Sequence, residues 1–538
     1  MIDQGPVPTK DHAQPDSARR RRGLLKSMAS VSAITMGSRV LGLVREQVRA
    51  ALLGTSFASD AFGIAFQIPN LLRRLVAEGA MSAGFIPVLS EQREKHGEDA
   101  ARDFAVRFLN LSLLALTILS AVGALAAGAV VAAFALIGGR EIAPEAQALT
   151  TDLTRWMFPY IALVSWAAIA QGILNTYRVF WVSAFTSVLL NIAIIGAALG
   201  LAGHVEQPAW GFVVGVLVGG ALQLGFQVPY VYKLGYRWRP VFRPGPAVRR
   251  ALWLLVPTLF GAGVYQINVL VSQAIAWSLG SGAVSSLQYS SRLLELTLGV
   301  FAVAVSTVVL PSLSADAAAG AVDRVRETVL YSVRLCAFVC LPVTAGLFLL
   351  RVETASLLFE RGAYSAESAQ WTGYALGFHI LGLTHIALAR VFVPVFYAFK
   401  DTRTPVYVAF VSMIVNVVLC YALAEPLGHG GIALANTASA FVQAIALAAL
   451  LRRHTGPLSD ETTLRSVGLS LAATCLMATA LYFGVDILGT STRHGFLELA
   501  GPYAALLLVA GAAYFGPCFA LRHPELRELL GLLRRNRS

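Results

Sequence analysis

The sequence predicts an all-α polytopic membrane protein with about fourteen transmembrane helices, arranged as two six-helix lobes related by a parallel repeat plus two extra C-terminal helices. Three observations predict this class. The 538 residues are 56% hydrophobic and 13% charged, with a mean hydropathy of +0.66, whereas a soluble surface of this size needs far more charge. The apolar runs are about 20 to 30 residues long, which suffices for helices that cross a bilayer. Two blocks of six runs also share short sequences at nearly the same offset.

The order of the apolar runs divides the chain into six parts. Expected spans cover residues 27–54, 59–90, 104–138, 148–174, 180–203, 208–232, 251–279, 283–313, 327–350, 368–397, 405–424, 431–451, 464–488 and 498–521. The predicted parts are a cytoplasmic tail (1–26), an N-lobe (27–235), a basic cytoplasmic linker (236–250), a C-lobe (251–453), a further pair of spans (454–523) and a basic cytoplasmic tail (524–538). Pro69 lies inside the second span, where a missing N–H is expected to kink the helix.

Short matches relate the two six-span blocks. FTSVLLN ends at Asn191 and FVSMIVN ends at Asn416, 225 residues later. Pro87 of IPVLS and Pro311 of LPSLS are 224 residues apart. Because each block has an even number of spans, the two copies have the same orientation, as in transporters whose halves are related by an axis along the membrane normal. The substrate path of such transporters lies between the halves.

The formal charge of +12 is distributed as in a membrane protein rather than a nucleic-acid-binding one. Lys and Arg gather before the first span and after the second, sixth, eighth, tenth and twelfth spans, and at the C-terminal tail, while most of the intervening connections have almost none. This positive-inside pattern places both termini in the cytoplasm. The segment around Arg351 and Arg361 is the exception, since it falls on the outer side.

No catalytic or metal-binding motif is evident in the sequence. The five cysteines lie in apolar runs without a CxxC motif, and His379 and His385 lie on different faces of one span, so packed side chains are expected. A P-loop, GxSxG or HExxH motif is not found. We therefore expect a transporter without a metal ion or cofactor, and not an enzyme.

Charged residues are unusually frequent in the first two spans. An arginine at the centre of a lipid-facing helix costs roughly 2.5 to 3.5 kcal/mol, so these side chains should face each other or an aqueous cavity. The planar donor fork of arginine matches phosphate oxygens, and the run therefore favours a cavity for a phosphate-bearing substrate. The charged residues of this run are Arg39, Arg45, Glu46, Arg49, Asp60, Arg73, Arg74 and Glu78.

Structural alternatives exist for these residues. Interhelical ion pairs or snorkelling side chains could explain individual charges, above all Arg49 and Arg74, which have acidic partners or lie near helix ends. Asp60, at the outer start of the second span, could cap that helix or belong to a gate. Arg292 and Glu295 are three residues apart in the eighth span and could form an internal pair or face the cavity.

Several segments resemble the MurJ (MviN) family of lipid II flippases. They are SAITMGSRVLGLVRE, SDAFGIAFQIPNLLRRLVAEGAMSAGFIPVLSE, SSRLLEL followed by VVLPSLS, and LFERGAYS, and the likeness covers nearly the whole chain. The resemblance implies membership of the multidrug, oligosaccharidyl-lipid and polysaccharide exporter superfamily. It also implies two six-helix lobes around a cationic cavity, with two extra helices that form a groove for the lipid tail. The implied activity is movement of the undecaprenyl-pyrophosphate-linked peptidoglycan precursor from the inner to the outer leaflet by alternating access, for cell-wall synthesis.

The resemblance also implies the site residues. Arg39, Arg45, Arg73 and Arg292 match the family's substrate-handling arginines. A second set of residues matches further polar positions of the family's cavity or its gate. These residues are Glu46, Asp60, Asn70, Glu78 and Glu295. Glu46 stands where the family usually has Asp, so its contacts are left open.

The expected energy source, partners and location complete this hypothesis. Some relatives have a sodium site with an acidic residue in the seventh span, but this span, FGAGVYQINVLVSQAIAWSLG, has no carboxylate, which favours coupling to membrane potential or to a monovalent ion such as a proton. The expected partners are lipid II, membrane lipids and candidate cell-wall synthesis proteins, without nucleic acid, and the expected location is the bacterial cytoplasmic (inner) membrane. Alternatives are a polysaccharide-precursor or drug exporter of the same superfamily, a membrane scaffold, and a polyprenyl-phosphate glycosyltransferase.

Overall fold

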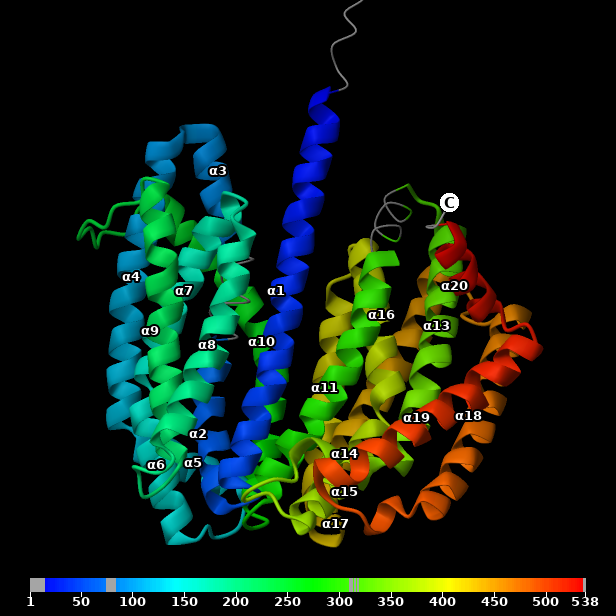
Figure 1. Cartoon of the computed structure of the whole chain (residues 1–538). Coiled ribbons are helices and arrows are strands. Elements are labelled where there is room, and N and C mark those ends of the chain that lie inside the picture. Colours follow the sequence, from blue (N-terminus) through cyan, green and yellow to red (C-terminus); the bar gives the residue numbers. More distant parts are fainter. Residues whose placement is uncertain (1–14, 74–83, 309–312, 314–315, 317–318, 536–538) are drawn as a thin grey trace, which may run out of the picture.

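A computed structural model describes residues 15–73, 84–308, 313, 316 and 319–535, and every regular element in these ranges is helical (Figure 1). The predicted all-α class is thereby confirmed. In the part of the chain described, eight helices are long and apolar enough to cross a membrane, and the bent pair α15–α16 gives a ninth. One of the eight, α17, contains two expected spans. The remaining expected spans correspond to α1, α2 with α3, α10, and α11.

The N-lobe follows the six expected spans with two interruptions. Its third span is divided at Ala126, and its fourth is divided before Pro159, whose missing N–H ends the hydrogen-bond ladder of the preceding helix. The helices of this lobe are α1 (Pro15–Leu53), α2 (Phe57–Arg73), α3 (Ile86–His96), α4 (Glu98–Leu125), α5 (Ala127–Gly138), α6 (Pro144–Met157), α7 (Pro159–Thr176), α8 (Phe180–Leu201) and α9 (Ala209–Lys233).

The C-lobe repeats this arrangement with a different break pattern. Its helices are α10 (Pro246–Trp277), α11 (Ala283–Val308), α13 (Val322–Leu349), α14 (Arg351–Phe359), α15 (Ala366–Ile380), α16 (Leu383–Ala398) and α17 (Arg403–Thr455). The non-helical backbone of Gly428, with φ 55° and ψ −140°, separates the two spans within α17. The helices α15 and α16 meet at an angle of 45°.

Helix α10 straddles the two lobes. Near its start, Val248, Ala251 and Leu255 pack in one apolar cluster with Phe85 and Phe104 of the N-lobe. Arg250 Nη1 also lies 2.8 Å from Glu91 Oε2 of α3. Its final residues instead pack with α5, α11 and α17. The helix that begins the C-lobe in the sequence is therefore shared between lobes in space.

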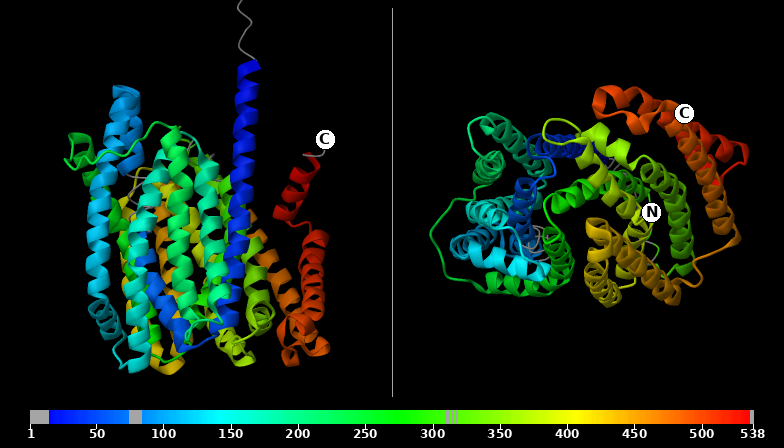
Figure 2. Two further views of the ribbon diagram at one scale, coloured as in Figure 1. Left: turned by 60° about the vertical axis from the view of Figure 1, so that its left-hand side comes forward. Right: turned by 90° about the horizontal axis from the view of Figure 1, so that it is seen from below.

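The extra C-terminal helices lie on the outside of the C-lobe (Figures 1 and 2). Helices α18 (Glu461–Leu488) and α19 (Gly495–Ala520) form a hairpin that packs against α13 and α14. At the hairpin tip, Gly495 N donates to Ser356 Oγ of α14 over 3.0 Å, and the hydroxyls of Thr354 and Tyr503 are 2.8 Å apart. These contacts attach the hairpin to the C-lobe.

A buried polar cluster holds α20 (Pro524–Arg535) against the opposite end of this hairpin. Arg334 Nε of α13 donates to Glu525 Oε1 over 2.7 Å, and Ser466 Oγ of α18 donates to Glu525 Oε2 over 2.5 Å. His523 Nδ1 lies 3.1 Å from the same carboxylate, and His523 Nε2 lies 3.0 Å from Ser470 Oγ. Glu525 is 2% exposed. Burial of Glu525 alone would raise its pKa, but its hydrogen bonds with His523, Ser466 and Arg334 lower the pKa below the ordinary value.

We expect Glu525→Gln to release α20. Removing one partner of a buried ion pair costs about 3 to 5 kcal/mol, and the amide retains part of the hydrogen bonding, so docking should weaken by about 2 to 3 kcal/mol. Amide hydrogen exchange in α20 should therefore accelerate by about 30- to 150-fold. Glu528→Gln, an exposed change in the same helix, is the matched control. Equal exchange in both variants would contradict this anchoring role.

The docking of α20 through Glu525 should weaken only when the pH falls. Because the folded pKa of Glu525 is lowered, its contribution is complete above the ordinary carboxyl pKa and is lost as pH falls through the lowered value. The protection factor of α20, the intrinsic exchange rate divided by the observed rate at the same pH, should therefore stay high at neutral pH and fall only in acid, whereas that of Glu525→Gln should be low at both. Fast exchange of the wild type at neutral pH would contradict this expectation.

Candidate functional site

A cavity of about 800 Å³ lies between the two lobes. The N-lobe contributes α1 and α2, and the C-lobe contributes α10, α11, α15, α16 and α17. The N-lobe wall carries arginines, while the C-lobe wall is rich in amide and hydroxyl groups. The polar side chains of that second wall include Asn268, Ser272, Gln273, Gln288, Ser412, Asn436, Ser439 and Gln443.

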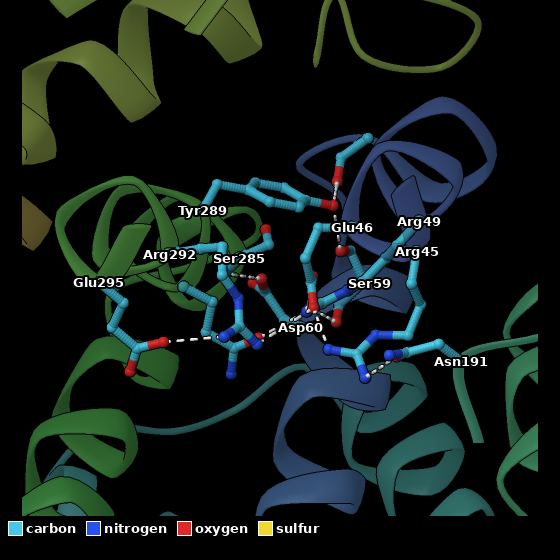
Figure 3. Close-up of polar contacts among 12 residues, drawn as sticks. Arg45, Glu46, Arg49, Ser59, Asp60, Asn191, Ser285, Tyr289, Arg292 and Glu295 are labelled. Atoms are coloured by element: carbon cyan, nitrogen blue, oxygen red, sulfur yellow. Dashed lines mark hydrogen bonds and ion pairs between the residues drawn. The ribbon is translucent and has the colours of Figure 1, made fainter. Parts of the chain in front are cut away.

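One carboxylate gathers three guanidinium groups at the cavity surface (Figure 3). Arg45 Nη2 lies 2.6 Å from Glu46 Oε1, Arg49 Nη1 lies 3.6 Å from Glu46 Oε2, and Arg292 Nη2 lies 3.5 Å from Glu46 Oε1. Arg292 also lies 2.8 Å from Glu295 Oε2. We call Arg45, Glu46, Arg49 and Arg292 the arginine cluster. Its three positive charges exceed the two negative charges of Glu46 and Glu295, so it can attract an anion.

Matched asparagines fix the first helix of each lobe. Asn191 of α8 accepts from Arg45 Nη1 over 3.1 Å and donates to the Ser38 carbonyl of α1 over 3.2 Å. Asn416 of α17 accepts from Ser272 Oγ of α10 over 3.1 Å. The interhelical hydrogen bonds predicted at these repeat positions are confirmed. In the N-lobe the asparagine also orients a cavity arginine, which the sequence did not reveal.

Arg49 bridges the lobes rather than forming only a local pair. Its Nη1 donates to Gln288 Oε1 of α11 over 2.8 Å, and its Nη2 donates to the Ser59 carbonyl over 2.8 Å. The guanidinium carbon lies 5.3 Å from the Phe62 ring centroid and 5.4 Å from that of Tyr289. Arg49 is 6% exposed, so these contacts replace its hydration.

Gly63 of α2 makes room for this bridge. A Cβ atom at Gly63 would lie 2.5 Å from Gln288 Oε1 and 2.9 Å from Arg49 Nη2. We expect Gly63→Ala to separate Arg49 from Gln288, at a cost of about 1 to 3 kcal/mol for the lost charge-assisted hydrogen bond, and to reduce transport by roughly 5- to 100-fold. The measurement is transport rate at equal protein abundance. Gly196→Ala in α8, where a Cβ meets nothing within 4 Å, is the control.

Asp60 joins the lobes at the end of the molecule where α1 turns into α2. Its Oδ2 accepts from the Gly282 N–H and its Oδ1 from the Ser285 N–H, both over 2.7 Å (Figure 3). Gly282 immediately precedes α11 (Ala283–Val308) and Ser285 lies in its first turn, where the leading N–H groups have no partner within the helix. Asp60 therefore caps a helix of the other lobe. The sequence had also left open that Asp60 caps its own helix α2, and the structure does not show this.

Further contacts complete this junction, which we call the outer gate because the charge pattern of the sequence predicts that this end faces outward. Ala363 N donates to the Ala51 carbonyl over 2.8 Å, and Gln47 Nε2 donates to the Leu358 carbonyl over 2.9 Å. Gly54 and Gly362 have φ values of 59° and 59°, and a Cβ atom at either would overlap a carbonyl oxygen of the facing lobe, that of Ala363 or of Ala51. Glycine is required here by both conformation and close approach.

The other predicted site residues are distributed more widely. Asn70 and Glu295 line the cavity, and Glu295 also pairs with Arg292. Arg39 is exposed on α1, and its Nη1 would lie 2.6 Å from a Cβ at Gly299 of α11, away from the arginine cluster. Arg73 is the last residue of α2, and its side chain, like Arg74 and Glu78, lies outside what the structure describes.

Two cavity residues were not singled out as binding residues by the sequence. His379 Nδ1 lies 2.8 Å from Ser290 Oγ, and Arg390 is an exposed cation in α16. The sequence signal for Arg390 is that it is the only arginine between residues 362 and 402. Among the described residues, no three His, Cys, Asp or Glu side chains are grouped as metal ligands. Chemically, the arrangement supports binding of an anion by arginines beside a wall that can hydrogen-bond to saccharide or peptide groups.

Comparisons with known proteins agree over nearly the whole chain. A family model described as lipid II flippase MurJ matches residues 49–498. A probable lipid II flippase MurJ of Vibrio cholerae is 36% identical over 499 residues, covering 91% of this chain and 95% of the relative. The lipid II flippase MurJ of Burkholderia cenocepacia is 34% identical over 500 residues, covering 92% and 96%.

Solved structures show a similar fold. A structure titled lipid II flippase MurJ, inward closed conformation, has a TM-score of 0.78 and 25% identity, covering 93% of this chain and 99% of that one. An inward-facing multidrug resistance MATE family transporter of the MOP superfamily has a TM-score of 0.63 and 15% identity, covering 80% and 98%. The second likeness concerns the fold alone.

Proposed function

Because this chain belongs to the MurJ family of lipid II flippases, we propose that it moves lipid II from the inner to the outer leaflet of the bacterial cytoplasmic membrane for cell-wall synthesis. The family makes it a multi-pass membrane transporter rather than an enzyme. The single observation that supports the substrate most directly is the arginine cluster inside an interlobe cavity. Such a cluster suits the diphosphate that joins the polyprenyl tail to the saccharide and peptide.

The headgroup would occupy the cavity while the tail stays in lipid. A diphosphate and a saccharide-peptide are too polar to cross hydrocarbon without compensating hydrogen bonds. Arg45 and Arg292 present donor forks to the diphosphate from opposite lobes, and the amide and hydroxyl wall can bind the remaining headgroup. The polyprenyl tail would lie along α18 and α19, whose exposed side chains include Leu476, Phe483, Leu508 and Phe515.

The closed outer gate supports an inward-facing state. With both termini in the cytoplasm, as the charge pattern predicts, Asp60 and the paired backbone segments lie at the periplasmic end. The headgroup would then enter from the cytoplasm, and separation of Asp60 from α11 would open the cavity outward. Alternating access of this kind requires two discrete arrangements of the lobes.

We further propose that membrane potential or a monovalent ion resets the lobes. The net positive charge of the arginine cluster supports this, because an inside-negative potential draws an unoccupied cationic site toward the cytoplasm. Phosphate binding would neutralise the cluster and remove that force. Proteins of cell-wall synthesis are the proposed partners at the outer leaflet.

The function is tested by outer-leaflet exposure of labelled lipid II in cells depleted of their own flippase. Expression of this chain should restore exposure and growth. The control is the same depleted cells without expression of this chain. Normal abundance of this chain in the membrane without restored exposure would contradict the proposed function.

A further inference from the structure

Arg390 places a further positive charge in the cavity, and it is distant in sequence from the arginine cluster. It belongs to the face of α16 that lines the cavity, together with Ile386, Ala389, Val393 and Pro394. The spacing of three and four residues places these side chains on one side of the helix. Arg390 is exposed, while Val391 and Phe392, on the other side, are buried in the C-lobe core.

The guanidinium of Arg390 differs from those of the arginine cluster in having no protein counter-ion. Within the described residues, neither an ion pair nor a side-chain hydrogen bond involves Arg390. Arg45, Arg49 and Arg292 all lie within 3.6 Å of Glu46. An arginine in a membrane protein is costly to place, so an uncompensated one facing a cavity indicates a ligand site.

The backbone at the same residue offers a hydrogen-bond acceptor. Pro394 has no N–H, so the carbonyl of Arg390 lacks the donor that residue i+4 supplies in a regular helix. Arg390 therefore offers a guanidinium donor and a backbone carbonyl that lacks its regular helical donor. This combination suits a carboxylate next to an amide N–H, which is the chemistry of a peptide end.

The position of Arg390 separates it from the diphosphate contacts. Arg292 lies nine residues after the start of α11, the end held by Asp60 at the outer gate. Arg390 lies 24 residues after Ala366, where the bent pair α15–α16 begins close to the gate residue Ala363. Apolar residues Leu294 and Leu298 of α11 line the cavity beyond Arg292. The two cationic points therefore lie on different helices and toward different ends of the cavity.

From this arrangement we infer that Arg390 binds a carboxylate of the headgroup's peptide, while the arginine cluster binds the diphosphate. This inference rests on the proposed function, because it assigns a second subsite to the same substrate. It makes Arg390 a specificity-determining residue that distinguishes a peptide-bearing lipid diphosphate from one without a free peptide carboxylate.

A double comparison of variants and ligands tests the subsite. Purified full-length protein in lipid nanodiscs is titrated with lipid II carrying its pentapeptide, and with the same lipid whose peptide carboxyl groups are converted to amides. We expect Arg390→Gln to weaken binding of intact lipid II by about 5- to 20-fold and binding of the amidated lipid by less than about twofold. Arg390→Lys, which keeps the charge, should retain most of the discrimination.

Controls separate this inference from the proposed function. Arg453→Gln, an exposed cation of α17 outside the cavity, should bind both lipids as the wild type does. An equal loss of both lipids in Arg390→Gln would mean that Arg390 contacts the diphosphate, and no loss of either would exclude a contact; both results overturn the inference. Failure of the wild type to bind lipid II would overturn the proposed function itself.

Discussion

Arg45→Ala should abolish support of growth in cells that depend on this chain for lipid II flipping, while leaving its abundance in the membrane unchanged. The substitution removes a donor fork from the cavity and the 2.6 Å and 3.1 Å contacts with Glu46 and Asn191. Hydrogen bonds to charged groups contribute about 1.5 to 3 kcal/mol each, so the loss of a two-bond fork to the diphosphate corresponds to a reduction of transport by at least about 100-fold. Outer-leaflet exposure of labelled lipid II is the measurement.

Two further variants sharpen this result. Arg45→Lys keeps the charge but cannot contact Glu46 and Asn191 with one planar fork, so partial activity is expected. Arg155→Ala removes an exposed arginine that pairs with Asp152 on α6, and it should behave as the wild type. Normal exposure of lipid II by Arg45→Ala would rule out the arginine cluster as the diphosphate site.

Asp60→Asn should open the outer gate without changing the fold. The amide can accept one of the two 2.7 Å hydrogen bonds, but its NH₂ group would face the second N–H of α11. Losing the charge at a helix N-terminus and leaving one N–H unpaired costs about 2 to 4 kcal/mol. The fraction of molecules with an open gate should therefore rise by about 30-fold or more.

The gate distance can be measured between spin labels at His204 and Glu367, which are exposed on the two lobes near the gate. Labelling is feasible because only Cys475 among the five cysteines is exposed, and it can be replaced first. Asp60→Asn should add a longer distance to the distribution. Asp152→Asn, an exposed change at the same end of the N-lobe, should not. Identical distributions for Asp60→Asn and the wild type would contradict the capping role.

Much of the fold and part of the site could be predicted from hydropathy and from the free-energy cost of placing a charge inside a membrane span. A span must be apolar along its length, so helix positions follow from local sequence. Arg45, Glu46 and Arg292 stand out because a charge inside such a span needs a partner or a cavity. The matched asparagines were found because the repeat preserves their contacts with α1 and α10.

The remaining site residues depend on contacts between distant segments. Gln288 gives no signal of its own, because an uncharged amide is tolerated in a span, and its role arises only when Arg49 approaches from 239 residues away. Asp60 could satisfy its own helix or another one, and the choice is made by the packing of α2 beside α11. Gly63 is informative only once the side chain that occupies its space is known.

The glycines of the outer gate determine how it can open. At Gly54 and Gly362 the backbones of the two lobes are in direct contact. Few flexible side chains at the outer gate can therefore change rotamer to maintain contact as the lobes separate. Gradual widening is disfavoured, because the Ala363 hydrogen bond joins backbone to backbone and the short Asp60 carboxylate accepts from two backbone N–H groups at the start of α11. We therefore expect the outer gate to open in a single cooperative event, which would limit leakage of small ions during transport.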